Sequence, residues 1–140
     1  MKSYEFHSHT ADVRMEVRGD SFPELFTAAL EGMAELEGGG AGSTKDIPSR
    51  SSYVTRISLS SQNLTFLLID FLSAVLAQSH IHKVIFKKVK FRKLAETELE
   101  AEVEGAKVQE FEEDVKAVTY HEAEIRKKKG IYETTLVFDI

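Results

Sequence analysis

The spacing of apolar residues limits the possible folds of this chain more than any other feature, because it switches between the two-residue period of strands and the 3.6-residue period of helices. Val13, Met15 and Val17 alternate with charged residues, which indicates a strand with one face in water. Strands are expected at 13–17, 53–59, 88–92, 96–104, 115–125 and 132–140, and helices from Ser21 to the glycine run at 38–42 and over 64–77. This order predicts one α+β domain spanning residues 1–140, with two layers: a mixed, mostly antiparallel sheet packed on two helices.

Local signals place the starts of both helices. Ser21 is followed three residues later by Glu24, a capping box that predicts the first helix to begin there. Ser60 or Ser61 precedes the second apolar stripe and is expected to cap the second helix.

Two neighbouring segments carry opposite charges at alternate positions. Lys88, Lys90 and Arg92 share one face of the first, and glutamates occupy every second position of the other. A three-residue turn would set Arg92 opposite Glu96 and Lys90 opposite Glu98, so the two segments are predicted to pair as an antiparallel hairpin. The basic face could instead bind RNA, although the neighbouring glutamates cancel most of its field.

The composition excludes several classes of function. The chain has no cysteine, which rules out thiolate catalysis, thiolate zinc sites and disulfides. A net charge of -5 argues against a protein that grips phosphate backbones, so RNA is expected to be contacted only indirectly. The most apolar run, 64–77, contains Asp70 and is shorter than the ~20 residues that span a bilayer. We therefore expect a cytoplasmic protein with no membrane partner.

Acidic groups gather at the two ends of the chain. Asp139 and the α-carboxylate of Ile140 lie on adjacent residues, and oxygen donors of this kind suit calcium or magnesium. If the first and last strands bring their ends together, Asp12 adds a third carboxylate. The alternative is that Asp139 is an exposed side chain near a frayed terminus.

Two histidines precede Asp12 in the stretch "HSHTAD". His7 and His9 would lie on one side of an extended segment, close to Asp12, and histidine with carboxylate also suits zinc or manganese. They could equally complete a surface turn. Both interpretations stay open on the residues alone.

Four short motifs occur in a fixed order: "HTADV" at 9–13, "LLIDFL" at 67–72, "KAVTYH" at 116–121 and "FDI" at 138–140. Together they resemble the archease family over nearly the whole chain. The resemblance implies a small α+β protein that activates the GTP-dependent tRNA-splicing RNA ligase, promoting its guanylylation and its multiple turnover. It also implies a cofactor protein of that ligase and not an enzyme in its own right.

The resemblance also implies site residues. The family's metal site corresponds to Asp12, Asp139 and Ile140, with calcium as the ion, and Lys116 matches a functionally important lysine. His9 and His121 belong to the motifs without a clear role. The chain departs from the family pattern in three places, with Arg14 for a common glycine, Ala106 for a frequent glutamate and Tyr132 for a frequent tryptophan.

Two rival functions follow from the residues. A metal-dependent phosphoesterase would use Asp12, Asp139 and His9 to activate water on a metal. A chaperone or RNA-binding adaptor would use the basic face that contains Lys88 and Lys90.

Overall fold

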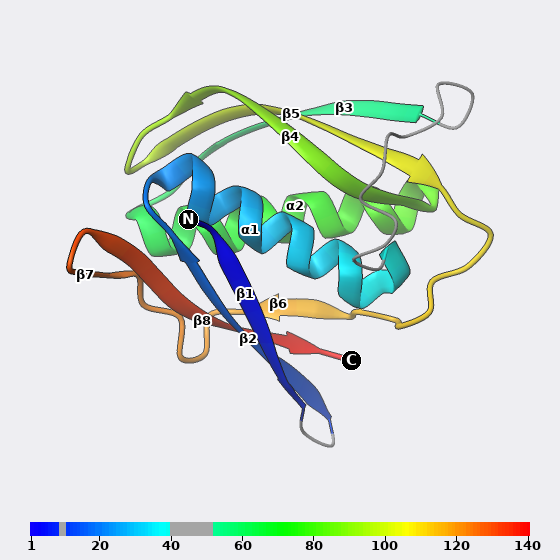
Figure 1. Cartoon of the computed structure of the whole chain (residues 1–140). Coiled ribbons are helices and arrows are strands. Elements are labelled where there is room, and N and C mark those ends of the chain that lie inside the picture. The colour runs from blue at the N-terminus through cyan, green and yellow to red at the C-terminus, as the bar shows by residue number, and fades with distance from the viewer. Residues whose placement is uncertain (9–10, 40–51) are drawn as a thin grey trace.

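Two antiparallel sheets lie on either side of a pair of helices in this computed structural model, which describes residues 1–8, 11–39 and 52–140 (Figure 1). The elements are β1 (Ser3–Ser8), β2 (Asp12–Gly19), α1 (Phe22–Ala34), the π-helix η1 (Glu35–Gly39), β3 (Ser52–Ser60), α2 (Leu64–His82), β4 (Val84–Leu94), β5 (Glu98–Lys107), β6 (Ala117–Thr119), β7 (Arg126–Lys128) and β8 (Ile131–Asp139). The predicted α+β class is confirmed.

The strands form two sheets where one was expected. The first has the order β1-β2-β8-β6, with β7 also pairing with β8, and the second has the order β3-β5-β4. All of the strand pairs in the described part of the chain are antiparallel. The prediction of a single sheet was wrong. The two helices have apolar surface on both sides of the pair, and a separate sheet buries each side.

The start of α1 is as predicted, whereas the start of α2 is not. The Ser21 hydroxyl accepts a hydrogen bond from the backbone N of Glu24 at 3.3 Å. At α2 the cap is Asn63, whose side-chain oxygen accepts from the backbone N of Phe66 at 2.9 Å. Ser60 is still part of β3, and the Ser61 hydroxyl donates a hydrogen bond to the Asp70 carboxylate. Neither serine therefore caps the helix.

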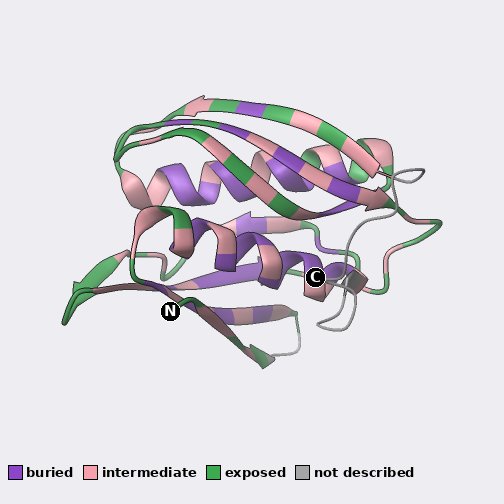
Figure 2. Cartoon of the chain, turned by 45° about the horizontal axis from the view of Figure 1, so that its top comes forward, coloured by how far each residue is buried: buried purple, intermediate pink, exposed green. Residues whose placement is uncertain are grey.

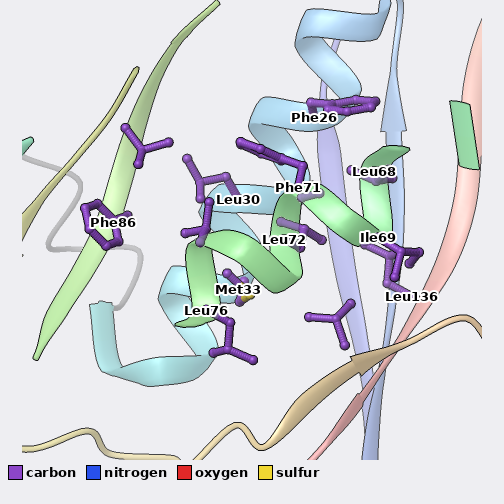
Figure 3. Close-up of a cluster of buried hydrophobic side chains, with 14 of the residues drawn as sticks. Phe26, Leu30, Met33, Leu68, Ile69, Phe71, Leu72, Leu76, Phe86 and Leu136 are labelled. Atoms are coloured by element: carbon purple, nitrogen blue, oxygen red, sulfur yellow. The ribbon is translucent and has the colours of Figure 1, made fainter. Parts of the chain in front are cut away.

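The core fills the space between the sheets. Buried residues alternate with more exposed ones along β2 and β5 (Figure 2), as expected for strands with one face on the core. Phe26 of α1 packs against Phe71 of α2 with ring centroids 5.9 Å apart, and Figure 3 shows these rings among the surrounding leucines. The fully buried helix residues include Leu25, Leu30, Met33, Leu67, Ile69, Leu72 and Val75.

Helix α2 is long and apolar enough to cross a membrane by length and composition alone. Its buried residues belong to the core, and it contacts α1 and strands of both sheets. A helix covered on several sides is expected to be apolar around its circumference. Its hydropathy is therefore explained by its place in the fold.

The predicted hairpin between the charged strands forms, but its register is wrong. Lys88 lies opposite Glu104 and Lys90 lies opposite Glu102, not Glu98. The hydrogen bond from the backbone N of Ala95 to the carbonyl of Glu98 closes a later turn. This turn lets Leu94 pair with Leu99, which is fully buried, so apolar burial sets the register while the pairing of opposite charges is kept.

The single strand predicted over 115–125 is also wrong. Only β6 forms there, and the chain then turns, with Glu122 at a φ of 63° and the backbone N of Ala123 donating to the carbonyl of Tyr120. Ala123 and Ile125 pack against the core without joining a ladder at that point. The apolar residues of 115–125 are therefore explained by a loop that packs on the core and not by an interior strand.

Candidate functional site

The ends of β2 and β8 meet at one edge of the first sheet. Asp12 lies directly opposite Asp139, and Val13 lies opposite Phe138. Because Val13 and Phe138 are buried in the core, the alternation of strands turns both aspartates to the outer face of the sheet. The backbone N of Ile140 donates to the carbonyl of Ala11 at 3.4 Å, which holds the terminal residue beside the pair. The structure thus brings together Asp12, Asp139 and Ile140.

The two carboxylates differ in exposure. Asp139 is exposed, whereas Oδ1 of Asp12 is buried and has no hydrogen-bond partner. Neither carboxylate forms an ion pair within the part of the chain that the structure describes. A buried carboxylate oxygen without a donor is costly, and a cation at this point would remove that cost.

Lys116 reaches the same sheet edge through its main chain. Its backbone N donates to the carbonyl of Asp139 at 2.8 Å, and the next residue, Ala117, pairs with Asp139 in the β6–β8 ladder. Lys116 also lines a hollow beside α2, together with Ser73 and His80 of that helix. Lys116 is therefore next to the aspartate pair in the backbone of the sheet.

The two histidines of the motifs are not both at this edge. His121 is exposed in the turn after β6, where its backbone N donates to the Thr119 hydroxyl at 3.3 Å. Strand β6 runs from Ala117, opposite Asp139, to Thr119, opposite Val137, and so carries His121 away from the pair. His9 lies outside the described residues.

Comparison with known proteins decides the family. The model of the Archease protein family matches residues 4–140. The chain belongs to the archease family. An archease of Methanosarcina mazei is 30% identical over 99% of this chain and 97% of the relative. An archease of Pyrococcus abyssi is 30% identical over the full length of both chains.

Solved structures agree with this archease in fold. The solution structure of Methanobacterium thermoautotrophicum protein 1598 covers 98% of each chain with a TM-score of 0.72 and 25% identity. An archease from Thermotoga maritima, described as a possible chaperone, covers 96% of this chain and 94% of its own with a TM-score of 0.69 and 21% identity.

Two motifs of the archease meet at Asp70 of α2. Its carboxylate accepts hydrogen bonds from the Ser61 hydroxyl at 2.6 Å and from the Tyr120 hydroxyl. The hydrogen bond to Asp70 raises the pKa of the Tyr120 hydroxyl. The Tyr120 ring also packs edge-on against Phe66, with centroids 5.2 Å apart. Sequence reasoning gave Asp70 no role, although both residues lie in the motifs that it singled out.

Arg14, which departs from the family pattern, holds the same turn from the sheet side. Its guanidinium forms an ion pair with Glu122 at 2.5 Å. The departure therefore adds a link between β2 and the turn that carries His121, and it leaves Asp12 and Asp139 in register.

His7 does not join Asp12, contrary to one of the two interpretations left open by the sequence. Its Nε2 lies 2.7 Å from an oxygen of Glu16 and 3.9 Å from an oxygen of Glu5. The sequence prediction missed β1, and with it this group. Tyr4 and Phe6 alternate with Glu5 and His7, so a two-residue period was available as a signal.

Proposed function

We propose that this archease activates the GTP-dependent tRNA-splicing RNA ligase, promoting its guanylylation and multiple turnover, through a cation site formed by Asp12, Asp139 and the α-carboxylate of Ile140. The observation that carries the proposal is the β2–β8 register, which sets Asp12 opposite Asp139 and holds Ile140 at Ala11. Oδ1 of Asp12 supports the proposed cation site, because this buried carboxylate oxygen can coordinate a metal ion and accepts no hydrogen bond from the protein.

The donor set fits a hard cation. Asp12, Asp139 and Ile140 offer carboxylate oxygens, which calcium prefers and which suit zinc less well. A bound divalent cation would supply positive charge for anionic groups of the ligase or its substrates. The role of the chain is to hold three carboxylates together at one sheet edge, where the backbone N of Lys116 bonds to the carbonyl of Asp139.

The phosphoesterase alternative has weaker support. It needs a histidine beside the aspartates, yet His7 points to Glu16 and His121 is carried away by β6. The remaining candidate, His9, lies outside the described residues. We favour a cofactor protein over an enzyme because the resemblance to the archease family implies it and no described histidine is shown in contact with the aspartates.

The surface of the protein also gives little support to the RNA-adaptor and chaperone alternatives. The basic residues Lys88 and Lys90 lie opposite Glu104 and Glu102, which cancels most of their field, so any contact with RNA would be indirect.

The description of the Thermotoga maritima relative suggests a chaperone, which needs a continuous apolar surface. The exposed large apolar residues in the described ranges come from separate elements: Met1, Val54, Ile81 and Tyr120. An activator working in the cytoplasm with its ligase fits these surfaces better.

The direct test mixes the purified protein with its ligase, GTP and RNA ends, and follows guanylylation and the number of turnovers. Addition of the wild-type chain should increase both, and Asp12→Asn and Asp139→Asn should each remove most of the increase. Asp114→Asn is the matched control, because this side chain is 74% exposed and its ion-pair partner is His80. Unchanged guanylylation and turnover with the wild-type protein would refute the activator role.

A further inference from the structure

The outer face of the β1–β2 hairpin carries a second group of metal-binding side chains, separate from the aspartate pair. Glu5 and His7 lie on β1 and Glu16 lies on β2, and one ligand atom from each lies within 4.8 Å of the other two. We propose that Glu5, His7 and Glu16 bind a transition-metal ion such as Zn²⁺. This inference goes beyond the proposed function and does not depend on it.

The strand register builds the group. Glu5 lies directly opposite Glu16, an arrangement of like charges that destabilises a strand pair unless a cation compensates it. His7 follows two residues after Glu5 and therefore projects from the same face of β1. Two carboxylates and one imidazole thus converge from adjacent strands.

The neighbouring arginines leave the converging atoms available. Arg18 lies 3.6 Å from Oε1 of Glu16, which leaves Oε2, the oxygen that contacts His7, on the side of the metal site. Arg14 lies opposite His7, but its guanidinium is engaged by Glu122. Arg14 and Arg18 therefore have carboxylate partners in Glu122 and Glu133, and neither forms an ion pair with Glu5 or with Oε2 of Glu16 in the described part of the chain.

The distances require only small side-chain movements. Ligand atoms around a tetrahedral zinc ion are about 3.4 Å apart, given metal–ligand bonds of about 2.1 Å. The His7–Glu16 distance of 2.7 Å would lengthen slightly and the His7–Glu5 distance of 3.9 Å would shorten slightly. Strand β1 is at the edge of its sheet and the three side chains are 38% to 66% exposed, so water can complete the coordination shell.

The donor types separate this site from the aspartate pair. An imidazole nitrogen with two carboxylates suits Zn²⁺ or Mn²⁺, whereas a set of carboxylate oxygens alone suits Ca²⁺. The two sites should therefore bind different ions. A metal at His7 would also join the edge strand β1 to β2, the strand that carries Asp12.

The test is a titration of the full-length chain with Zn²⁺ by isothermal calorimetry. His7→Ala and Glu16→Gln should each weaken zinc binding by roughly tenfold or more, and Glu5→Gln should also weaken it. Asp12→Asn should leave it unchanged, which separates this inference from the proposed function. His80→Ala is the matched control. His80 lies 4.0 Å from one carboxylate, that of Asp114, and it belongs to no group of three metal-binding side chains among the described residues.

A second measurement keeps the result clear if a variant folds poorly. In NMR spectra of the wild-type chain, zinc should shift the imidazole signals of His7 and leave those of His80 and His82 in place. Zinc binding that persists at full strength in His7→Ala, or zinc that shifts other histidines and not His7, would overturn the proposal.

Discussion

At the scale of single residues, two buried carboxylate oxygens in the described part of this archease have no hydrogen-bond partner, and their surroundings give them different roles. Oδ1 of Asp12 lies beside a second carboxylate at a sheet edge. Oε2 of Glu37 lies in η1, where only 1% of the residue is exposed. Charge at Asp12 can be compensated by a cation from solvent, whereas burial of Glu37 favours the protonated form of its carboxyl group.

The first prediction concerns the pH dependence of stability caused by Glu37. Burial raises the pKa of Glu37 to about 8 from an ordinary value of 4.5. Between these values the folded protein binds more protons than the unfolded chain, so this group makes the unfolding free energy fall as the pH rises from about 4.5 to about 8. The steepest slope is ~1.4 kcal/mol per pH unit. Urea unfolding at several pH values should show this slope in the wild-type protein and not in Glu37→Gln.

A control separates burial from charge in general. Glu110 is exposed, and Glu110→Gln should leave the slope as it is in the wild-type protein. Equal slopes in the wild-type chain and Glu37→Gln would show that Glu37 is ionised without cost in the folded state.

At the scale of elements, helix α2 and the turn after β6 are joined by several polar contacts. Besides the hydrogen bonds at Asp70, the backbone N of Ile125 donates to the Thr65 hydroxyl at 3.0 Å. Both ends of the Tyr120–Ile125 turn are therefore fixed to the first two turns of α2. The position of the helix start decides where this turn and the strand that follows it can lie.

The second prediction tests which residue caps α2. Asn63→Ala should lower the unfolding free energy by about 1 kcal/mol, because the backbone N of Phe66 loses its side-chain acceptor. Ser60→Ala should change stability little, since Ser60 is an exposed residue at the end of β3. Chemical denaturation of the two variants measures both effects. A larger loss from the serine than from the asparagine would restore the cap that the sequence predicted.

Local patterns predicted most elements, and long-range burial explains the errors. The capping box at Ser21 acts within four residues, so the sequence alone could place it. The register of β4 and β5 depends on where Leu99 is buried, which charge alternation does not reveal. The sequence could predict that Asp12 and Asp139 meet only if the first and last strands are neighbours, and the sequence does not show which strands pair. In the structure β2 and β8 are neighbours in the sheet.

At the scale of the whole molecule, the first sheet joins segments from the two ends of the sequence. Its neighbours β2 and β8 come from the beginning and the end of the chain, and the helices pack between this sheet and the second one (Figure 1). An ion at the aspartate pair would therefore stabilise a long-range contact that must break when the domain unfolds. Binding to the folded state alone stabilises by about 2.7 kcal/mol at a ligand concentration of 100 Kd.

The third prediction is a reversal of the stability order by calcium. Without metal, Asp12 and Asp139 are like charges directly opposite each other, and such a pair is destabilising by roughly 0.2–1 kcal/mol. Asp139→Asn removes the repulsion, so in a chelator the variant should melt at a higher temperature than the wild-type protein. In millimolar calcium the wild-type protein should gain stability and overtake the variant, because only its site keeps both aspartates. Thermal unfolding followed by circular dichroism in the two buffers measures the order, with Asp114→Asn expected to follow the wild-type protein in both. An unchanged order in the two buffers would mean that the aspartate pair does not bind calcium.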